Sequence, residues 1–328
     1  MRVTHSVIAA AEVAKIAARE YDLGALPTGR LLSDTDNNHY LLTAGETNFV
    51  FRIYRRGKYW LTKESDYRFE LEWLAYLHEQ GLPVTYPIPR RNGDLLGRLD
   101  APEGERYYAL FSFAPGCVVH PMNAGQSRLF GEGIARIHLA SDRFQPKQRR
   151  FHQDTDWLID APLARIDTFL EGRRPEAVAF FRGLAPSLKE TLRGLPRSAP
   201  FYGIIGGDFH GGNHFFSSEN RLTFFDFDMC GYGWRVYDLA NFLWSTKLRP
   251  EMGTTWTDVL QGYETVRPLS EAERAALPAM VKVRHLWILG LHTTYSDQLG
   301  VGWLGDHYWE RNVARLREWG EEEKKSGE

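Results

Sequence analysis

The pattern of apolar residues changes near Pro115-Gly116, and this change constrains the fold of the 328-residue chain more than any other feature. Before it, short β-favouring runs alternate with polar turns over residues 30–54, and further strands are expected at 95–99 and 107–113. After it, helical spacing of apolar residues dominates to the C-terminus. The sequence therefore predicts an α+β chain with a β-rich first part and a mostly helical second part.

Helices and one further group of strands can be placed within these two parts. Helical spacing indicates helices over residues 6–20 and 62–79, and Gly81 follows the second of them as a typical stop signal. Asn123 is expected to cap a helix at the start of the helical part. A β-rich stretch at 201–233 interrupts the helical pattern, and its residues carry the chemistry described below.

Composition excludes several classes of function. The chain has 40 Lys+Arg against 42 Asp+Glu, so its net charge of -2 gives no global reason to expect a nucleic acid or an anionic membrane as partner. Two cysteines, Cys117 and Cys230, are too few for a secreted disulfide scaffold. No apolar run approaches the roughly 20 residues of a membrane span. We therefore expect a cytoplasmic protein, and the 13% of aromatic residues indicates a ligand pocket.

Acidic and amide side chains follow glycines in the β-rich stretch. Asp208 and Asn213 lie five positions apart in a glycine-rich loop, and Asp226 ends the next strand. Carboxylate and amide oxygens are the ligands that Mg²⁺ takes when it also binds substrate phosphates. An Asp and an Asn at this spacing, followed by an Asp on a strand, form the arrangement used in phosphoryl transfer. The spacing therefore predicts a magnesium-phosphate site.

Six segments in order resemble one family. The chain resembles the aminoglycoside phosphotransferase/choline kinase-like superfamily, and within it the type II homoserine kinases and the bacterial stress-response Ser/Thr kinases. The segments that carry the resemblance are 49–54, 69–84, 111–116, 133–138, 206–228 and 231–240. The resemblance implies a protein-kinase-like two-lobed fold. It implies a nucleotide-binding lobe at 1–113, β-rich with one helix, and a larger, mostly helical catalytic and substrate-binding lobe at 114–328.

The resemblance also implies roles for the motif residues. Asp208 is expected to accept the proton of a substrate hydroxyl, and Asn213 and Asp226 are expected to hold Mg²⁺ at the phosphates of ATP. The alternative is a loop Asp, a turn Asn and an edge-strand Asp without chemistry. Asp228 either supports this site or faces solvent. Gly206 stands where the family has a His, which puts the rigidity of the loop in question.

Five residues of the first lobe are implied at the nucleotide. Strand alternation puts Arg52 on the face opposite Phe51, where it would neutralise phosphate charge with Glu70 as its partner. A basic surface and a solvated helix charge are the alternatives for this pair. Ser33 belongs to the turn 33–38, in which Ser33, Asn side chains or backbone amides would cover the phosphates. Phe111 and Phe113 belong to the hinge.

Three further positions also carry expectations. His210 is interpreted as a packing or hydrogen-bonding residue rather than a proton shuttle. Asp238 either supports the catalytic loop, as in relatives, or caps a helix. Arg284 shares a helical stripe with three apolar side chains that are either core or acceptor pocket. The other pocket candidates near the C-terminus are Trp287, His292, Tyr295, Asp297, Trp303, His307, Tyr308 and Trp309.

These observations predict an ATP- and Mg²⁺-dependent phosphotransferase. The acceptor would be a hydroxyl of a small molecule: an amino acid, an amino alcohol, a sugar or an aminoglycoside. The first alternative is a Ser/Thr protein kinase of the stress-response type, and the second is a nucleotide-binding pseudokinase. The sequence leaves the acceptor, the choice between ATP and GTP, and the oligomeric state open.

Overall fold

The computed structural model describes residues 3–252, 255–296 and 300–326. Contacts divide the chain into two compact units. The sheet unit comprises residues 1–119, 143–150 and 213–229, and the helical unit comprises the rest. The sequence predicted two lobes, each one continuous segment, with the boundary between residues 113 and 114. The sheet unit instead takes its residues from three segments of the chain.

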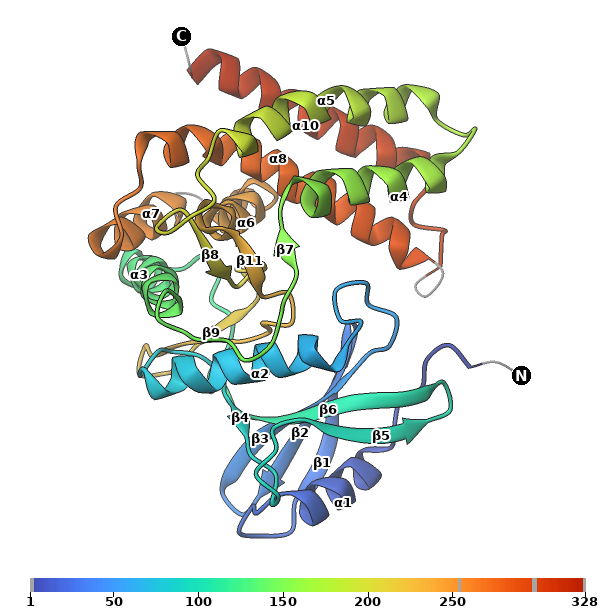
Figure 1. Cartoon of the computed structure of the whole chain (residues 1–328), viewed down its shortest axis with the longest axis vertical. Helices are drawn as coiled ribbons and strands as arrows, with labels where there is room; N and C mark the ends of the chain where they lie inside the picture. The colour runs from blue at the N-terminus through green and yellow to red at the C-terminus, as the bar shows by residue number, and fades with distance from the viewer. Residues whose placement is uncertain (1–2, 253–254, 297–299, 327–328) are drawn as a thin grey trace. The chain divides into compact units, whose positions relative to one another are not determined.

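The sheet unit contains a six-stranded antiparallel sheet (Figure 1). Its strand order is β1-β2-β3-β6-β4, and β5 pairs with β6. A separate hairpin is formed by β9 and β10. The strands are β1 (Thr28–Asp34), β2 (Asn37–Ala44), β3 (Thr47–Tyr54), β4 (Pro87–Ile88), β5 (Gly97–Ala101), β6 (Gly104–Ser112), β9 (His214–Phe216) and β10 (Leu222–Phe224). The polar turn expected at 100–105 is shorter than predicted, because β5 and β6 stay paired as far as Ala101 and Gly104.

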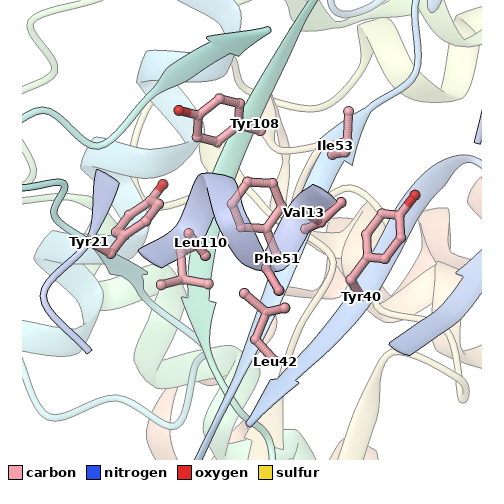
Figure 2. Close-up of a cluster of buried hydrophobic side chains, with 10 residues drawn as sticks. Val13, Tyr21, Tyr40, Leu42, Phe51, Ile53, Tyr108 and Leu110 are labelled. Atoms are coloured by element: carbon pink, nitrogen blue, oxygen red, sulfur yellow. The ribbon is translucent and has the colours of Figure 1, made fainter. Parts of the chain in front are cut away.

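Two helices belong to this unit, where the sequence predicted one for the lobe. They are α1 (Ala10–Glu20) and α2 (Glu64–Glu79). Val13 of α1 packs with Phe51 and Ile53, which alternation places on one face of β3 (Figure 2). All three side chains are fully buried. The helix expected at 6–20 therefore covers one face of the sheet and leaves the other face of β3 to its polar residue, Arg52.

The helical unit carries a small sheet among its helices. The sheet has the order β7-β11-β8, with β11 parallel to β7 and antiparallel to β8. The strands are β7 (His152–Gln153), β8 (Tyr202–Ile205) and β11 (Gly231–Trp234). The helices are α3 (Ala124–Ser141), η1 (Asp156–Asp160), α4 (Ala161–Leu170), α5 (Pro175–Arg193), α6 (Arg235–Lys247), η2 (Pro250–Met252), α7 (Thr255–Val266), α8 (Glu271–Thr294) and α10 (Asp306–Ser326).

Local signals in this unit match the helices that form. Asn123 caps α3, since its side chain accepts a hydrogen bond from the Gln126 backbone N–H at 2.9 Å. The α+β fold with an antiparallel N-terminal sheet and a helical C-terminal part is confirmed. The last described helix, α10, continues to Ser326. Over the described ranges, no helix is long and apolar enough to cross a membrane.

Candidate active site

Arg52 joins three acidic and aromatic side chains of the sheet unit. Its Nη1 lies 2.8 Å from Glu70 Oε1, and its Nη2 lies 3.4 Å from Asp226 Oδ1. The guanidinium carbon lies 4.7 Å from the centre of the Phe111 ring. Arg52 is 5% exposed and Glu70 is fully buried. The expected pairing of Arg52 with Glu70 is therefore present, and neither residue belongs to a solvated surface.

Burial and charge act in opposite directions on this pair. Burial raises the pKa of Glu70, and the Arg52 charge opposes that rise. The Tyr54 hydroxyl also donates a hydrogen bond to Glu70 Oε2 at 3.0 Å. Burial favours loss of the Arg52 proton, but the charges of Glu70 and Asp226 outweigh it and raise the pKa of Arg52. Arg52 therefore keeps its positive charge in this buried position.

His39 connects Arg52 with Ser33. Arg52 Nε donates to His39 Nε2 at 3.1 Å, and His39 Nδ1 lies 3.1 Å from Ser33 Oγ. Because a guanidinium can only donate, His39 Nε2 accepts, and Nδ1 carries the proton that is donated to Ser33. Burial, followed by the charges of Arg52 and Lys58, lowers the pKa of His39 to about 3. A neutral imidazole therefore fixes Ser33 relative to Arg52.

A pocket of about 280 Å³ opens over this cluster within the sheet unit. Its polar lining includes Ser33, Arg52 and Asp226, and its apolar lining includes Phe111 and Phe113. Glu70 does not line the pocket, but it pairs with Arg52, which does. The remaining lining residues are Leu32, Thr35, His39, Val50, Thr85, Ser112, Ala114, Phe215 and Phe225.

Sequence reasoning missed several residues of this pocket. Val50 shares the Arg52 face of β3, so strand alternation could have identified it. Phe215 and Phe225 flank the motif that holds Asn213 and Asp226, and their position beside it was a usable signal. Thr85 carries no comparable signal, because its place in the pocket depends on tertiary packing.

The β9–β10 hairpin brings Asn213 and Asp226 to one end. The last pair of the hairpin is His214 with Phe224, and the Asn213 carbonyl accepts a hydrogen bond from the Phe225 N–H at 3.1 Å. Asp226 follows with a φ of 65°, a left-handed conformation that Asp tolerates better than most residues. Asn213 and Asp226 are therefore held next to each other in the sheet unit.

Asn213 and Asp226 supply the kinds of oxygen donor that a magnesium ion takes. Among the described residues, no group of three or more His, Cys, Asp or Glu side chains could hold a metal ion. Mg²⁺ is usually bound through one or two protein oxygens together with phosphates and water. An amide oxygen of Asn213 and a carboxylate of Asp226 match that donor set.

Asp228 is buried and does not face solvent. It is 5% exposed, Lys58 Nζ donates to its Oδ2, and Asn37 Nδ2 donates to the same oxygen at 3.0 Å. Burial favours the protonated form, but the charges of Lys58 and Arg52 outweigh it and lower the pKa of Asp228. Lys58 lies between β3 and α2, and no pattern in the sequence marks it. Asp228 was expected either to support the site or to face solvent, and this geometry agrees with the supporting role.

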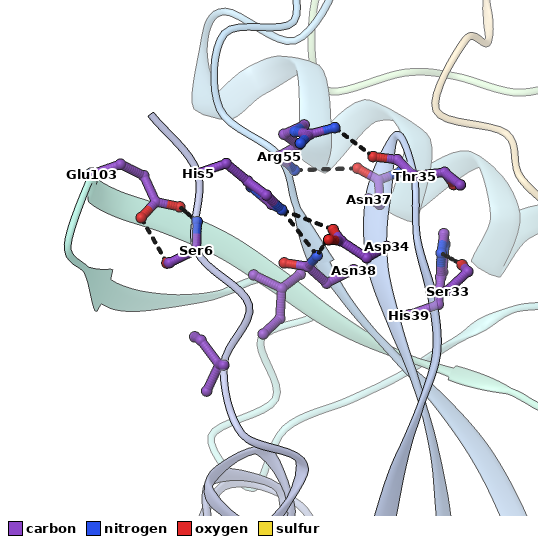
Figure 3. Close-up of polar contacts among 12 residues, drawn as sticks. His5, Ser6, Ser33, Asp34, Thr35, Asn37, Asn38, His39, Arg55 and Glu103 are labelled. Atoms are coloured by element: carbon purple, nitrogen blue, oxygen red, sulfur yellow. Dashed lines mark hydrogen bonds and ion pairs between the residues drawn. The ribbon is translucent and has the colours of Figure 1, made fainter. Parts of the chain in front are cut away.

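The turn between β1 and β2 is held by side chains from outside it (Figure 3). His5 Nε2 lies 2.8 Å from Asp34 Oδ1, and Arg55 Nη1 donates to the Thr35 carbonyl at 2.6 Å. Asn37 and Asn38 are fully buried, so their side chains do not cover a ligand as the sequence allowed. Within this turn, Ser33 and Thr35 line the pocket instead.

The glycine-rich loop of the helical unit is held by Asp238. The backbone N–H groups of Gly206 and Gly207 donate to Asp238 Oδ2 and Oδ1 at 2.9 and 2.7 Å. His138 Nε2 lies 2.9 Å from Asp238 Oδ2. Burial raises the pKa of Asp238 to about 7, and the two backbone N–H groups oppose that rise. Asp238 therefore supports the loop, and the N-cap of α6 is Trp234 instead.

The loop explains why glycine stands at position 206. A Cβ atom added to Gly206 would overlap the Phe209 ring, so the family His could stand here only if that ring moved. His210 accepts a hydrogen bond at Nδ1 from the Gly212 N–H at 2.9 Å. This bond agrees with a hydrogen-bonding role for His210 within the loop.

Asp208 pairs with Arg284 of α8. Arg284 Nη2 donates to Asp208 Oδ1, and the guanidinium carbon lies 5.3 and 5.0 Å from the ring centres of Trp244 and Trp287. Arg284 is 2% exposed. The sequence placed Arg284 among acceptor-pocket candidates, whereas the structure shows it bound to the expected catalytic carboxylate. Asp297, another of those candidates, lies outside the described residues.

The expected site residues therefore fall into two groups. Asp208 belongs to the helical unit, and Asn213, five positions later, begins the last segment of the sheet unit. The expected residues of the sheet unit are Ser33, Arg52, Glu70, Phe111, Phe113, Asn213 and Asp226.

Comparisons with known proteins place this chain in a family. The model of the phosphotransferase enzyme family, APH, matches residues 28–269. An uncharacterized protein of Synechocystis sp. is 31% identical over 323 residues, which cover 96% of this chain and 87% of that protein. A homoserine kinase of Agrobacterium fabrum is 28% identical over 267 residues, which cover 80% of this chain and 78% of that protein.

Two solved structures have the same fold. A microcompartment-associated aminopropanol kinase superposes with a TM-score of 0.77 at 23% identity, covering 94% of this chain and 95% of that chain. An amicoumacin kinase in complex with AMP-PNP, Ca²⁺ and Ami superposes with a TM-score of 0.75 at 22% identity, covering 94% and 92%. The fold and the family match define a kinase-like phosphotransferase. The chain belongs to the phosphotransferase enzyme family.

Proposed function

We propose that this phosphotransferase moves the γ-phosphate of ATP to a hydroxyl group of a small molecule that also carries an amine. The observation that carries the proposal is the pocket of the sheet unit, whose polar lining includes Arg52 and Asp226 and whose walls are aromatic and aliphatic. An apolar pocket with a cationic group suits a purine base joined to phosphates.

Arg52 is the proposed phosphate ligand of the pocket. Its charge persists because Glu70 and Asp226 stabilise it, and Ser33 is tied to it through His39. The guanidinium is thus oriented before a nucleotide binds, which lowers the ordering cost of binding. Phe111 and Phe113 would contact the base.

Asn213 and Asp226 are the proposed Mg²⁺ ligands. When bound, the ion would neutralise negative charge on the phosphates of ATP. Asp228, fixed by Lys58 and Asn37, lies two residues from Asp226 and would hold that segment in place.

Asp208 is the proposed base for the acceptor. The acceptor oxygen forms a bond to the γ-phosphorus while the bond from that phosphorus to the β–γ bridging oxygen breaks, which leaves ADP. The hydroxyl proton passes to the Asp208 carboxylate and then to solvent. The products are ADP and a phosphate monoester, so atoms and charge balance.

The relatives support an amine-bearing acceptor. Homoserine is an amino acid with a side-chain hydroxyl, and aminopropanol is an amino alcohol, so the two named kinases share the pairing of amine and hydroxyl. We therefore place L-homoserine and amino alcohols ahead of sugars as acceptors for this chain.

A panel of acceptors tests the proposal. The purified protein is incubated with labelled ATP, Mg²⁺ and one acceptor at a time: L-homoserine, 1-amino-2-propanol, choline, spectinomycin or casein. Label is expected in a small molecule that carries both an amine and a hydroxyl group. Asp208→Asn is expected to lower the rate by about 10²–10⁴-fold, the usual contribution of a general base, with AMP-PNP binding retained.

Two results would contradict the proposal. Label in casein alone would replace the small-molecule acceptor with a protein acceptor. Turnover by Asp208→Asn close to that of the wild type would remove the general base from the scheme, even if a small molecule is labelled.

A further inference from the structure

The segment Gly206-Gly207-Asp208 is contacted by two different helices of the helical unit. Asp238, in the first turn of α6, accepts the N–H groups of both glycines. Arg284, in the middle of α8, donates to Asp208 Oδ1 and lies 3.5 Å from the Gly207 carbonyl oxygen. Asp238 thus holds the two backbone amides, and Arg284 holds the Gly207 carbonyl group and the Asp208 carboxylate.

Arg284 itself has little freedom to move. Its side chain is 3% exposed, whereas that of Asp208 is 20% exposed. The rings of Trp244 and Trp287 lie 5.3 and 5.0 Å from the guanidinium carbon, a distance typical of cation–π contact. An arginine enclosed in this way has already lost its rotamer freedom, so it can hold a partner at little further entropic cost.

We infer that Arg284 is a positioning residue that fixes the orientation of the Asp208 carboxylate toward the acceptor hydroxyl. This inference rests on the proposed function, in which Asp208 is the base. A carboxylate can rotate about its Cβ–Cγ bond, and a planar donor at one oxygen stops that rotation. Orientation of a reacting group is a large part of catalysis, and small displacements lower the rate strongly.

The inference separates Arg284 from the nucleotide. Arg284 and its two tryptophans belong to the helical unit, whereas the pocket residues, including Arg52 and Asp226, all belong to the sheet unit. Loss of Arg284 should therefore lower kcat with little change in the KM for ATP. A residue that only stabilised the fold would change the amount of folded protein and leave the kcat of the folded fraction as it is.

The test compares Arg284→Met, Arg284→Lys and Arg284→Ala with Arg235→Met. Arg235 is a matched control, because it is also a buried arginine of this unit, and it pairs with Asp142 rather than with the loop. ADP formation from Mg·ATP is measured with the acceptor panel above. Each rate is divided by the folded fraction from circular dichroism.

Arg284→Met is expected to lower kcat by about 10²-fold, the size of loss that misplacement of a reacting group causes. Arg284→Lys should lose less, and Arg235→Met should keep the kcat of the wild type. Guanidinium ion, added below denaturing concentrations, should raise the kcat of Arg284→Ala, because it can enter the space between the two tryptophan rings and donate to Asp208.

Two outcomes would overturn the inference. One is a folded Arg284→Met or Arg284→Lys protein with wild-type kcat, and the other is an Arg284→Ala protein that guanidinium does not reactivate. Asp208→Asn in the same assay separates this failure from failure of the proposed function. If Asp208→Asn is inactive while Arg284→Met is active, only the role of Arg284 is lost, whereas an active Asp208→Asn removes the base itself.

Discussion

Buried charged residues with several partners organise the candidate site. Arg52 uses three different nitrogens at once, donating Nε to His39 and directing Nη1 and Nη2 to Glu70 and Asp226. A lysine at this position has one nitrogen and could not make the same three contacts in a plane. This geometry gives a physical reason for an arginine at position 52.

The buried pair of Lys58 and Asp228 leads to a stability prediction at the same scale. Both side chains are nearly inaccessible to solvent. Lys58→Met leaves the Asp228 carboxylate buried without its cation, so it is expected to lower the free energy of unfolding by about 3–5 kcal/mol. Urea unfolding followed by circular dichroism measures this change.

Lys15→Met is the control for that prediction. Lys15 also pairs with a carboxylate of the sheet unit, that of Glu12, but both side chains are more than half exposed. Surface pairs contribute about 0–1 kcal/mol, so Lys15→Met should change stability by less than about 1 kcal/mol. Equal losses in the two variants would show that the Lys58 pair has no special role.

Helices α3 and α7 approach each other so closely that only glycine fits between them. A Cβ atom on Gly131 of α3 would overlap the Val259 carbonyl oxygen of α7, and one on Gly262 of α7 would overlap the Arg128 carbonyl oxygen of α3. Backbone atoms cannot move aside as a flexible side chain can. The contact between these two elements therefore depends on both glycines.

Gly131→Ala is expected to destabilise the protein by about 1–3 kcal/mol, the usual cost of overpacking. Gly183→Ala is the matched control, because Gly183 is an exposed helical glycine of α5 with nothing within 4 Å of an added Cβ. Alanine there should stabilise the helix by about 0.5–1 kcal/mol. Thermal unfolding of both variants measures the direction of each change in stability. Stabilisation by Gly131→Ala would refute the close contact.

At the expected hinge, Gly116 and Cys117 contact strand β9. Gly116 follows β6 with a φ of 101°, and a Cβ atom there would overlap the Phe216 carbonyl oxygen of β9. Cys117 exchanges two backbone hydrogen bonds with Phe216, at 3.3 and 3.0 Å. The chain thus leaves the sheet through a glycine that packs directly on the hairpin preceding Asp226.

At the scale of the whole molecule, the expected nucleotide residues lie in one unit. The sheet unit contains the pocket and both expected magnesium ligands, although they come from residues 32–114 and 213–226. Ligand that binds the folded form suppresses local opening of the parts it contacts. Mg·AMP-PNP is therefore expected to slow amide hydrogen exchange in β1, β2, β3 and the β9–β10 hairpin.

Helices α5 and α10 of the helical unit serve as internal controls for that experiment, since no pocket residue belongs to them. Hydrogen exchange followed by mass spectrometry resolves the two sets of peptides. Slower exchange confined to α5 and α10, with none in the strands, would contradict nucleotide binding in the sheet unit.

Sequence reasoning succeeded where a signal is local. Alternation in β3 identified the face of Arg52, and helical spacing with an Asn cap identified α3. It failed where a contact joins distant positions: Lys58 meets Asp228 across 170 residues, and Arg284 meets Asp208 across 76. The number of helices beside the sheet was also wrong by one, because periodicity finds a helix without saying which element it packs on.

The sequence alone determined the class of fold, the family and the order of its motifs, because strand alternation, helical period and a glycine-rich loop are properties of short segments. Only the tertiary structure decided which side chains Asp208 and Asp228 meet. Burying a charged side chain without a partner costs a large free energy. Each buried charge must therefore pair with a group that the fold places beside it. Asp228 and Asp208 each acquired their partner in this way, whereas the pairing of Arg52 with Glu70 was predicted from the sequence.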